Sequence, residues 1–192
     1  MKVDPDRELV ERARAGERAA FDLLVARYQR RLLRLVLRLL RDQAEAEDVV
    51  QETFLRAYRA LPRFRGDAAF YTWLYRIALN GARSTILRRR QRAAPHGLVP
   101  SQLPAPVPEI GTPESMLLSK QVMQTIDAAL EALPLELRTV IALREIEGLS
   151  YEEIAQIMEC PLGTVRSRIF RAREAIARRL RPLLDLPVDK RW

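Results

Sequence analysis

The stretch Ser150–Leu180, SYEEIAQIMECPLGTVRSRIFRAREAIARRL, decides how the C-terminal part of the chain folds. Ser150 followed by Glu153 is a capping box, in which each side chain can satisfy a free backbone N–H group at the start of a helix. Pro161 fits the first position of a second helix, because the N–H group it lacks would have no partner there. The stretch therefore predicts two helices separated by a tight turn at Glu159–Cys160.

The second of these predicted helices has one apolar face and is otherwise strongly basic. Its apolar residues recur at intervals of three or four: Val165, Ile169, Ala172, Ile176 and Leu180. The remaining faces carry Arg166, Ser167, Phe170, Arg171 and Arg173. A short helix, a tight turn and a basic helix whose start can enter a major groove form the docking geometry of a DNA-reading helix-turn-helix. The alternative is an ordinary basic amphipathic helix.

The charge distribution also favours a polyanionic partner. The chain of 192 residues has a formal net charge of +8, which is typical of proteins that bind nucleic acid. Residues 1–92 carry a net charge of +9, residues 114–160 carry −6 and residues 161–192 carry +6. The C-terminal part is therefore polarised, and its positive end coincides with the basic helix.

A proline-rich segment divides the chain. Residues 93–113 contain six of the twelve prolines and a single charged residue, Glu109, without apolar periodicity. Such a segment cannot form a core of its own and tends to be extended. The sequence therefore predicts two small domains, residues 1–92 and 112–192, joined by a flexible linker over residues 93–111.

Both predicted domains are helical. In the first, helical spacing of apolar residues predicts helices over about 5–15, 18–41, 44–61 and 69–90. In the second, it predicts one helix from Pro113 to about Leu133 and another that ends near Gly148, ahead of the helix-turn-helix. We expect the ordered region to close at Pro182 and Pro187. Because no stretch alternates with period two, the predicted fold class is all-α.

Aromatic and basic residues gather in the segment 63–76. Its five aromatic residues are Phe64, Phe70, Tyr71, Trp73 and Tyr75, and they interleave with Arg63, Arg65 and Arg76. Aromatic faces among basic groups suit single-stranded nucleic acid, because every base offers a face for stacking. Phe70 and Trp73 would also share one helix face, so we expect about half of these aromatics to be core. The turn at Gly66–Asp67 can form the lip of a pocket for an unstacked base.

Acidic residues gather at the start of the predicted third helix. They are Asp42, Glu45, Glu47, Asp48 and Glu52. Acids near a helix N-terminus complement the helix dipole, and no metal-ligand pattern is present. Residues of this helix that point away from the apolar stripe form an alternative protein-docking face: Asp48, Gln51, Glu52, Leu55 and Arg59. The basic run Arg88–Arg90 with Arg92 is either a solvated helix end or a track for phosphates.

Several functional classes are excluded by what the sequence lacks. The single cysteine, Cys160, rules out an internal disulfide and a cysteine-cluster metal site. The one histidine, His96, lies among prolines, and no nucleophile–base pair, Walker loop or dinucleotide motif is present. We therefore expect no enzymatic activity and no cofactor. The apolar run Leu32–Leu40 is too short to span a bilayer, and no signal peptide is recognisable, so the sequence predicts a cytoplasmic protein.

Three segments, in this order, resemble the extracytoplasmic-function sigma factors of bacteria, of the sigma-E/AlgU type. They are DVVQETFLRAYRAL (48–61), FRGDAAFYTWLYRIALN (64–80) and LREIEGLSYEEIAQIMECPLGTVRSRIFRARE (143–174). The resemblance implies a sigma-2 domain, a linker and a sigma-4 domain. It also implies a protein that binds core RNA polymerase and directs promoter-specific transcription initiation, of envelope or other stress-response genes.

The resemblance assigns roles to three sets of residues. The face that grips the clamp helices of the polymerase β′ subunit would contain Asp48, Val49, Gln51, Glu52 and Leu55. The segment that melts the −10 element would use Phe64, Arg65, Ala69, Trp73, Arg76 and Asn80. The reader of the −35 element would contain Arg166, Ser167, Phe170 and Arg171, with Pro161, Gly163 and Thr164 meeting phosphate at the helix start.

The same resemblance implies the partners. They are core RNA polymerase, through its β′ clamp helices and β flap, promoter DNA, and a membrane-anchored anti-sigma factor that would hold the protein at the inner membrane. The linker would thread through the RNA-exit path of the polymerase. An alternative reading is a conventional helix-turn-helix regulator of duplex DNA, which leaves the aromatic–basic segment unexplained. A DNA-cleaving enzyme would need a metal-binding or nucleophilic cluster that the sequence lacks.

Overall fold

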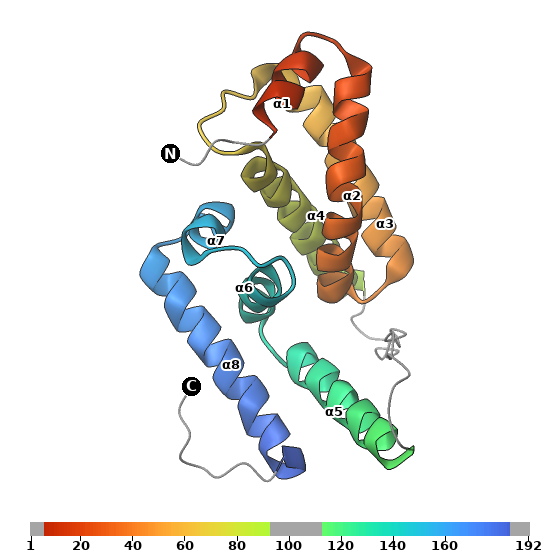
Figure 1. The fold of residues 1–192 in the computed structure, drawn as a ribbon, viewed down its shortest axis with the longest axis vertical. Coiled ribbons are helices and arrows are strands. Elements are labelled where there is room, and N and C mark those ends of the chain that lie inside the picture. The colour runs from red at the N-terminus through yellow and green to blue at the C-terminus, as the bar shows by residue number, and fades with distance from the viewer. Residues whose placement is uncertain (1–5, 93–112, 185–192) are drawn as a thin grey trace. The chain divides into compact units, whose positions relative to one another are not determined.

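A computed structural model describes residues 6–92 and 113–184, and every regular element in these two ranges is a helix (Figure 1). The elements of the first range are α1 (Arg7–Arg14), α2 (Arg18–Leu40), α3 (Gln43–Ala60), the 3₁₀ turn η1 (Leu61–Arg63) and α4 (Phe70–Arg92). The elements of the second are α5 (Pro113–Glu131), α6 (Leu135–Glu145), α7 (Tyr151–Met158) and α8 (Leu162–Leu184). The predicted all-α fold class is confirmed.

The helices group into two compact units. The first contains α1–α4, and residues 152–159 are grouped with it; the second contains α5, α6 and α8. The predicted linker, residues 93–111, lies outside the described residues.

In the first unit, α2, α3 and α4 pack against one another in all three pairs (Figure 1). The apolar stripes that predicted these helices form the core. Its largest fully buried side chains are Leu24, Leu32, Leu35 and Val36 of α2, Leu61 of η1, and Phe70, Leu74 and Tyr75 of α4. Burying each such side chain stabilises the fold by roughly 1.5–3 kcal/mol, so the three helices support each other and none needs to be stable alone.

The turn between α2 and α3 is fixed from both sides. Arg41 takes a left-handed conformation with φ 60°, and the Asp42 carboxylate accepts a hydrogen bond from the Glu45 N–H at 2.9 Å as the cap of α3. Arg89 of α4 donates to the carbonyl of Leu40 at 3.2 Å and lies 2.9 Å from the Glu45 carboxylate. At least this arginine of the basic run 88–92 is therefore structural, and part of the acidic cluster serves to begin a helix.

In the second unit, α8 packs against both α5 and α6. Val165, Ile169 and Ala172 of α8 are buried, as the periodicity predicted, with Val140 and Leu143 of α6, whereas Ile176 and Leu180 of the same stripe are only partly buried. Helix α8 continues through Pro182 and ends at Leu184, between the two prolines expected to close this part of the chain, and Pro187 lies outside the described residues. A proline near a helix end removes few hydrogen bonds, so the last turn tolerates it.

Candidate nucleic-acid and protein interfaces

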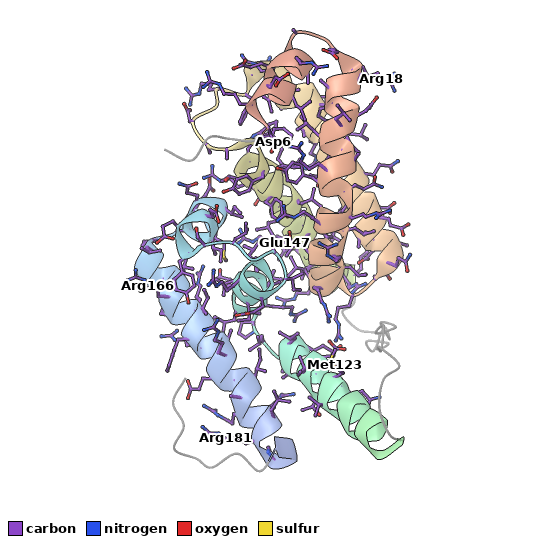
Figure 2. The ribbon with its side chains drawn as sticks, in the orientation of Figure 1. Asp6, Arg18, Met123, Glu147, Arg166 and Arg181 are labelled. Atoms are coloured by element: carbon purple, nitrogen blue, oxygen red, sulfur yellow. The ribbon has the colours of Figure 1, made fainter. Side chains whose placement is uncertain are left out.

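One face of the first half of α8 is exposed and carries the residues expected to read DNA. Arg166, Ser167 and Arg171 are exposed, and the Phe170 side chain is 65% exposed although it is a large apolar group. The buried residues Val165 and Ile169 lie on the opposite face. Figure 2 shows Arg166 near the start of α8 and Arg181 near its end. The exposed face therefore combines two guanidinium groups, a hydroxyl and an aromatic ring within two helical turns.

The start of α8 is shaped by the turn before it. Glu159 takes a left-handed conformation with φ 51°. The Pro161 carbonyl accepts hydrogen bonds from the N–H groups of Thr164 and Val165, at 2.9 and 3.2 Å. Pro161 therefore lies one residue before the helix and not at its first position. A Cβ added to Gly163 would meet nothing within 4 Å, so the backbone at this helix start can be approached closely from outside.

The arginines of α8 divide into two sets that the sequence did not separate. Arg168 forms an ion pair with Glu136 of α6, and Arg173 lies 2.7 Å from the Glu145 carboxylate of α6. The hydrogen bond that Arg173 donates to the Glu145 carboxylate raises the pKa of Arg173 above its ordinary value. These two arginines hold α8 on α6, whereas Arg166 and Arg171 lie on the exposed face.

The aromatic segment of the first unit also divides into a buried and a half-buried part. Phe70 and Tyr75 are fully buried, while Phe64, Tyr71 and Trp73 are partly exposed. The ring centroids of Phe64 and Trp73 lie 4.9 Å apart. Their distances to the ring centroid of Phe70 are 6.2 and 5.9 Å. The expectation that about half of these aromatics are core is confirmed.

The loop between η1 and α4 is open to solvent. Gly66 has φ 75°, a conformation that glycine adopts without strain. Arg65 and Asp67 form an ion pair at 3.2 Å, and both side chains are at least 75% exposed. Ala69, Trp73, Arg76 and Asn80 follow at intervals of four, three and four, so they share one face of α4. Asn80 is exposed, and the other three are partly exposed.

The exposed face of α3 is a ridge between two open grooves. One groove, of about 680 Å³, lies between α3 and α4, and the other, of about 780 Å³, lies between α2 and α3. Asp48, Gln51 and Leu55 are exposed and line both grooves. Glu52 lines the first and pairs with Arg56 at 2.7 Å. The ridge therefore presents two carboxylates, an amide and a leucine side chain.

Two residues of α3 differ from their expected places. Val49 is only 8% exposed, and a Cβ on Gly81 of α4 would lie 3.1 Å from its side chain; it therefore supports the ridge from below. Tyr58, which helical spacing after Val50, Phe54 and Ala57 places on the apolar stripe of α3, is 48% exposed and packs edge-on against Phe21, with ring centroids 4.9 Å apart. Its position beside α2 leaves one side of the ring in the α2–α3 groove.

Metal binding and membrane spanning find no support in the described parts of the chain. Over residues 6–92 and 113–184, no group of three or more His, Cys, Asp or Glu side chains is arranged to hold a metal ion. Within the same ranges, no helix combines the length and the apolar character that a membrane span requires.

Family models and known proteins match both units. Residues 24–93 match the family model for sigma-70 region 2, and residues 123–176 match that for sigma-70 region 4. The RNA polymerase sigma-H factor of Pseudomonas aeruginosa is 48% identical over 94% of this chain and 96% of its own length. The ECF RNA polymerase sigma-E factors of Salmonella typhimurium and Escherichia coli are each 48% identical over 93% of this chain and 96% of theirs.

Two solved structures share the fold. CnrH, in complex with the cytosolic domain of CnrY, has a TM-score of 0.70 and 29% identity, and the match covers 93% of this chain and 99% of CnrH. The sigma factor RpoE of Bartonella quintana, in complex with the anti-sigma factor NepR, has a TM-score of 0.68 and 26% identity, over 88% of this chain and 98% of that chain. Because the first unit also matches, the regulator alternative is not supported. The chain belongs to the extracytoplasmic-function sigma factors of the sigma-70 family.

Proposed function

We propose that this sigma factor binds core RNA polymerase and divides promoter recognition between its two units. The observation that carries the proposal is that each unit presents its own exposed surface suited to nucleic acid: basic and aromatic on α8, aromatic and basic at the start of α4. Duplex DNA is read by groups that reach base edges in a groove, whereas melted DNA is held by stacking platforms. The two surfaces fit these two tasks.

The α8 surface is proposed to read the −35 element as duplex. Arg166 and Arg171 can each form a bidentate pair with guanine, and Phe170 can contact a thymine methyl group. Ser167 supplies a hydroxyl that donates to the Thr164 carbonyl at 3.0 Å and can still accept a hydrogen bond. Pro161, Gly163 and Thr164 lie at the helix start, where backbone N–H groups and the helix dipole favour a phosphate. The open space at Gly163 supports a close approach of the DNA backbone.

The surface at the start of α4 is proposed to melt the −10 element and hold one strand. Phe64 and Trp73 offer ring faces beside an open loop, and an unstacked base costs a few kcal/mol to extrude. Stacking contributes about 1–3 kcal/mol per base, which offsets that cost. Arg65 and Arg76 would attract the phosphates, and Ala69 and Asn80 complete the face of α4.

The ridge on α3 is proposed to dock on the clamp helices of the polymerase β′ subunit through Asp48, Gln51, Glu52 and Leu55, with Val49 supporting them from below. The second unit would contact the β flap. The proposed domain limits are residues 1–92 for the first unit, 93–111 for the linker and 112–192 for the second. They are supported by family matches that end at residue 93 and begin again at residue 123.

An anti-sigma factor is the proposed inhibitor. Support comes from the two solved structures with TM-scores near 0.7, since one is described in complex with a cytosolic domain of another protein and the other with an anti-sigma factor. A membrane-anchored inhibitor would hold this protein in the cytoplasm at the inner membrane until a stress signal releases it. The genes it then transcribes would serve envelope or other stress responses.

The proposed function is tested by run-off transcription with purified core polymerase. We expect a discrete transcript from a promoter with matched −35 and −10 elements only when the protein is added. Scrambling either element should reduce the transcript. If the protein binds the promoter but core polymerase still gives no specific transcript, initiation is not its function.

A second prediction concerns docking on the polymerase. The double charge reversal Asp48→Lys with Glu52→Lys should weaken binding to core polymerase by at least about tenfold, because like charges across an interface cost several kcal/mol. Both side chains are partly or fully exposed, so the free energy of unfolding should change by no more than about 0.5 kcal/mol. Binding is measured by fluorescence anisotropy and stability by chemical denaturation.

The matched control is Glu8→Lys with Glu11→Lys on α1. These carboxylates are exposed and pair with Arg12 and Arg7. Because the control also replaces two acidic residues by lysine, it changes the net charge by the same amount on a different surface. The control should bind polymerase like the wild type. Equal losses in both variants would mean that overall charge, and not the α3 ridge, governs binding.

A further inference from the structure

A fully buried carboxylate lies at the start of α1, outside the residues that match region 2. Asp6 has no exposed surface, and it accepts hydrogen bonds from the Tyr28 hydroxyl and the Arg27 guanidinium of α2. Figure 2 shows its position at the beginning of α1. A buried carboxylate is costly unless it is paired and hydrogen-bonded. The bonds from Tyr28 and Arg27 therefore help to fix α1 and α2 in one arrangement.

A series of ring contacts connects this carboxylate to the proposed −10 surface. The ring of Tyr28, whose hydroxyl Asp6 holds, lies 6.0 Å from the ring of Phe70. Phe70 in turn contacts Phe64 and Trp73, at 6.2 and 5.9 Å. Tyr28 and Phe70 are buried, whereas Phe64 and Trp73 are partly exposed. The contacts therefore run from a buried anchor to the two rings that would stack on a base.

A second route reaches the same loop through the backbone. Helix α1 also contacts η1, the turn that immediately precedes the loop. The N–H group of Phe64 donates to the carbonyl of Leu61, in η1, at 3.0 Å. Displacing α1 would therefore disturb Phe64 from its backbone side as well as from its ring side.

We propose that Asp6 is a positioning residue for promoter melting: by holding Tyr28 it fixes Phe70, and through Phe70 it keeps Phe64 and Trp73 in the geometry that accepts an unstacked base. This inference rests on the proposed role of Phe64 and Trp73 at the −10 element. Helix α1 itself buries only Val10 and Ala13 as apolar side chains. Asp6 is fully buried although its partner Arg27 is 45% exposed, so polar contacts as well as these two apolar side chains hold α1 on α2.

The protonation of the Tyr28 hydroxyl favours a lasting hydrogen bond to Asp6. Burial, with a further contribution from the hydrogen bond to Asp6, raises the pKa of the Tyr28 hydroxyl far above its ordinary range. The hydroxyl therefore remains a hydrogen-bond donor throughout the physiological pH range.

The test uses the full chain with Trp192→Phe, which leaves Trp73 as the only tryptophan of the two in the sequence. Tyr28→Phe removes only the hydroxyl, whereas Asp6→Asn removes the charge and replaces one of the two accepting oxygens by an NH2 donor. The matched control is Val36→Ala, because Val36 is fully buried on the same helix α2 but belongs to none of these ring contacts. The readouts are Trp73 fluorescence emission, the affinity for a single-stranded −10 oligonucleotide and the affinity for a −35 duplex.

We expect Tyr28→Phe and Asp6→Asn to shift the Trp73 emission and to weaken binding of the single strand by about two- to thirtyfold, the range given for residues that act on a site without contacting its ligand. Binding to the −35 duplex should be unchanged. Val36→Ala should lower the thermal unfolding temperature without either effect. If Asp6→Asn does not fold, Tyr28→Phe alone still tests whether the hydrogen bond between Tyr28 and Asp6 affects strand binding.

Two contrary results are distinguishable. If the wild type binds the strand and both anchor variants bind it as tightly with unchanged Trp73 emission, Asp6 has only a structural role and the inference is wrong. If the wild type itself shows no affinity for the −10 strand beyond that for an unrelated strand, the proposed −10 role fails, and the positioning role fails with it.

Discussion

Replacing Arg166 and Arg171 by alanine is expected to remove most of the discrimination between matched and mismatched −35 sequences. Both side chains are exposed on the face of α8 opposite its buried stripe. A bidentate contact from arginine to guanine contributes about 1–3 kcal/mol of discrimination, so each single variant should lose about five- to 150-fold in the ratio of matched to mismatched affinity. The ratio is measured with duplexes that differ at one base pair of the element.

Arg168→Ala and Arg173→Ala are the matched controls for this experiment. They remove the same charge from the same helix, but Arg168 and Arg173 pair with Glu136 and Glu145 of α6. The Arg173–Glu145 pair is about half exposed, so its loss should cost no more than about 1 kcal/mol of stability. Discrimination should persist in both controls.

The pattern of loss distinguishes two kinds of contact. A lost base contact relaxes the preference at one position, whereas a lost phosphate contact weakens all sequences about equally and lowers the salt dependence. If Arg166→Ala and Arg171→Ala reduce affinity uniformly and leave the preference intact, these arginines contact only phosphates. Another part of the protein would then read the −35 element.

The helices could be predicted from the sequence because their signals are local. In α8, apolar residues at intervals of three or four predicted the buried face, and Val165, Ile169 and Ala172 are buried. The capped start of α3 was similarly predictable, since acids near a helix N-terminus have a direct physical reason. Predicted helix limits differ from the observed ones mostly by one or two residues, as at Pro161.

The pairing of side chains could not be predicted, because it depends on residues distant in sequence. Arg168 and Glu136 are 32 positions apart, and Tyr28 and Asp6 are 22 apart. Periodicity predicts whether a residue is exposed or buried, but it does not predict which carboxylate an arginine pairs with. The same limit explains Tyr58, whose half-exposed position depends on where Phe21 of α2 lies.

The candidate interface that lies on a single helix could be predicted more completely than the one that combines a loop with a helix. The α8 surface lies within two turns, so its composition and its exposure follow from a single pattern. The aromatic surface of the first unit combines residues of the loop and of α4, and the sequence left open which rings were core. The structure separates them: Phe70 and Tyr75 are buried, and Phe64 and Trp73 remain accessible.

Replacing Phe64 or Asn80 by alanine is expected to impair strand capture at the −10 element while −35 binding persists. The Phe64 ring is partly exposed beside Trp73, and loss of one stacking face costs about 1–3 kcal/mol per base. Phe64→Ala should therefore weaken binding to a premelted promoter by about five- to 150-fold. Asn80 is exposed, so Asn80→Ala should reduce base preference with little change in stability.

Coupling between binding and melting follows from the same geometry. Duplex DNA buries its base faces, so in their proposed role the Phe64 and Trp73 rings would gain contacts only after the strands separate, and their binding energy would favour the open state. Both variants should therefore form fewer open complexes with polymerase, measured by permanganate reactivity of unpaired thymines. Leu87→Ala, at a 57% exposed apolar residue of the same helix, is the matched control and should form them normally. If Phe64→Ala and Asn80→Ala leave both strand affinity and open-complex formation intact, the aromatic cluster serves only to pack the core.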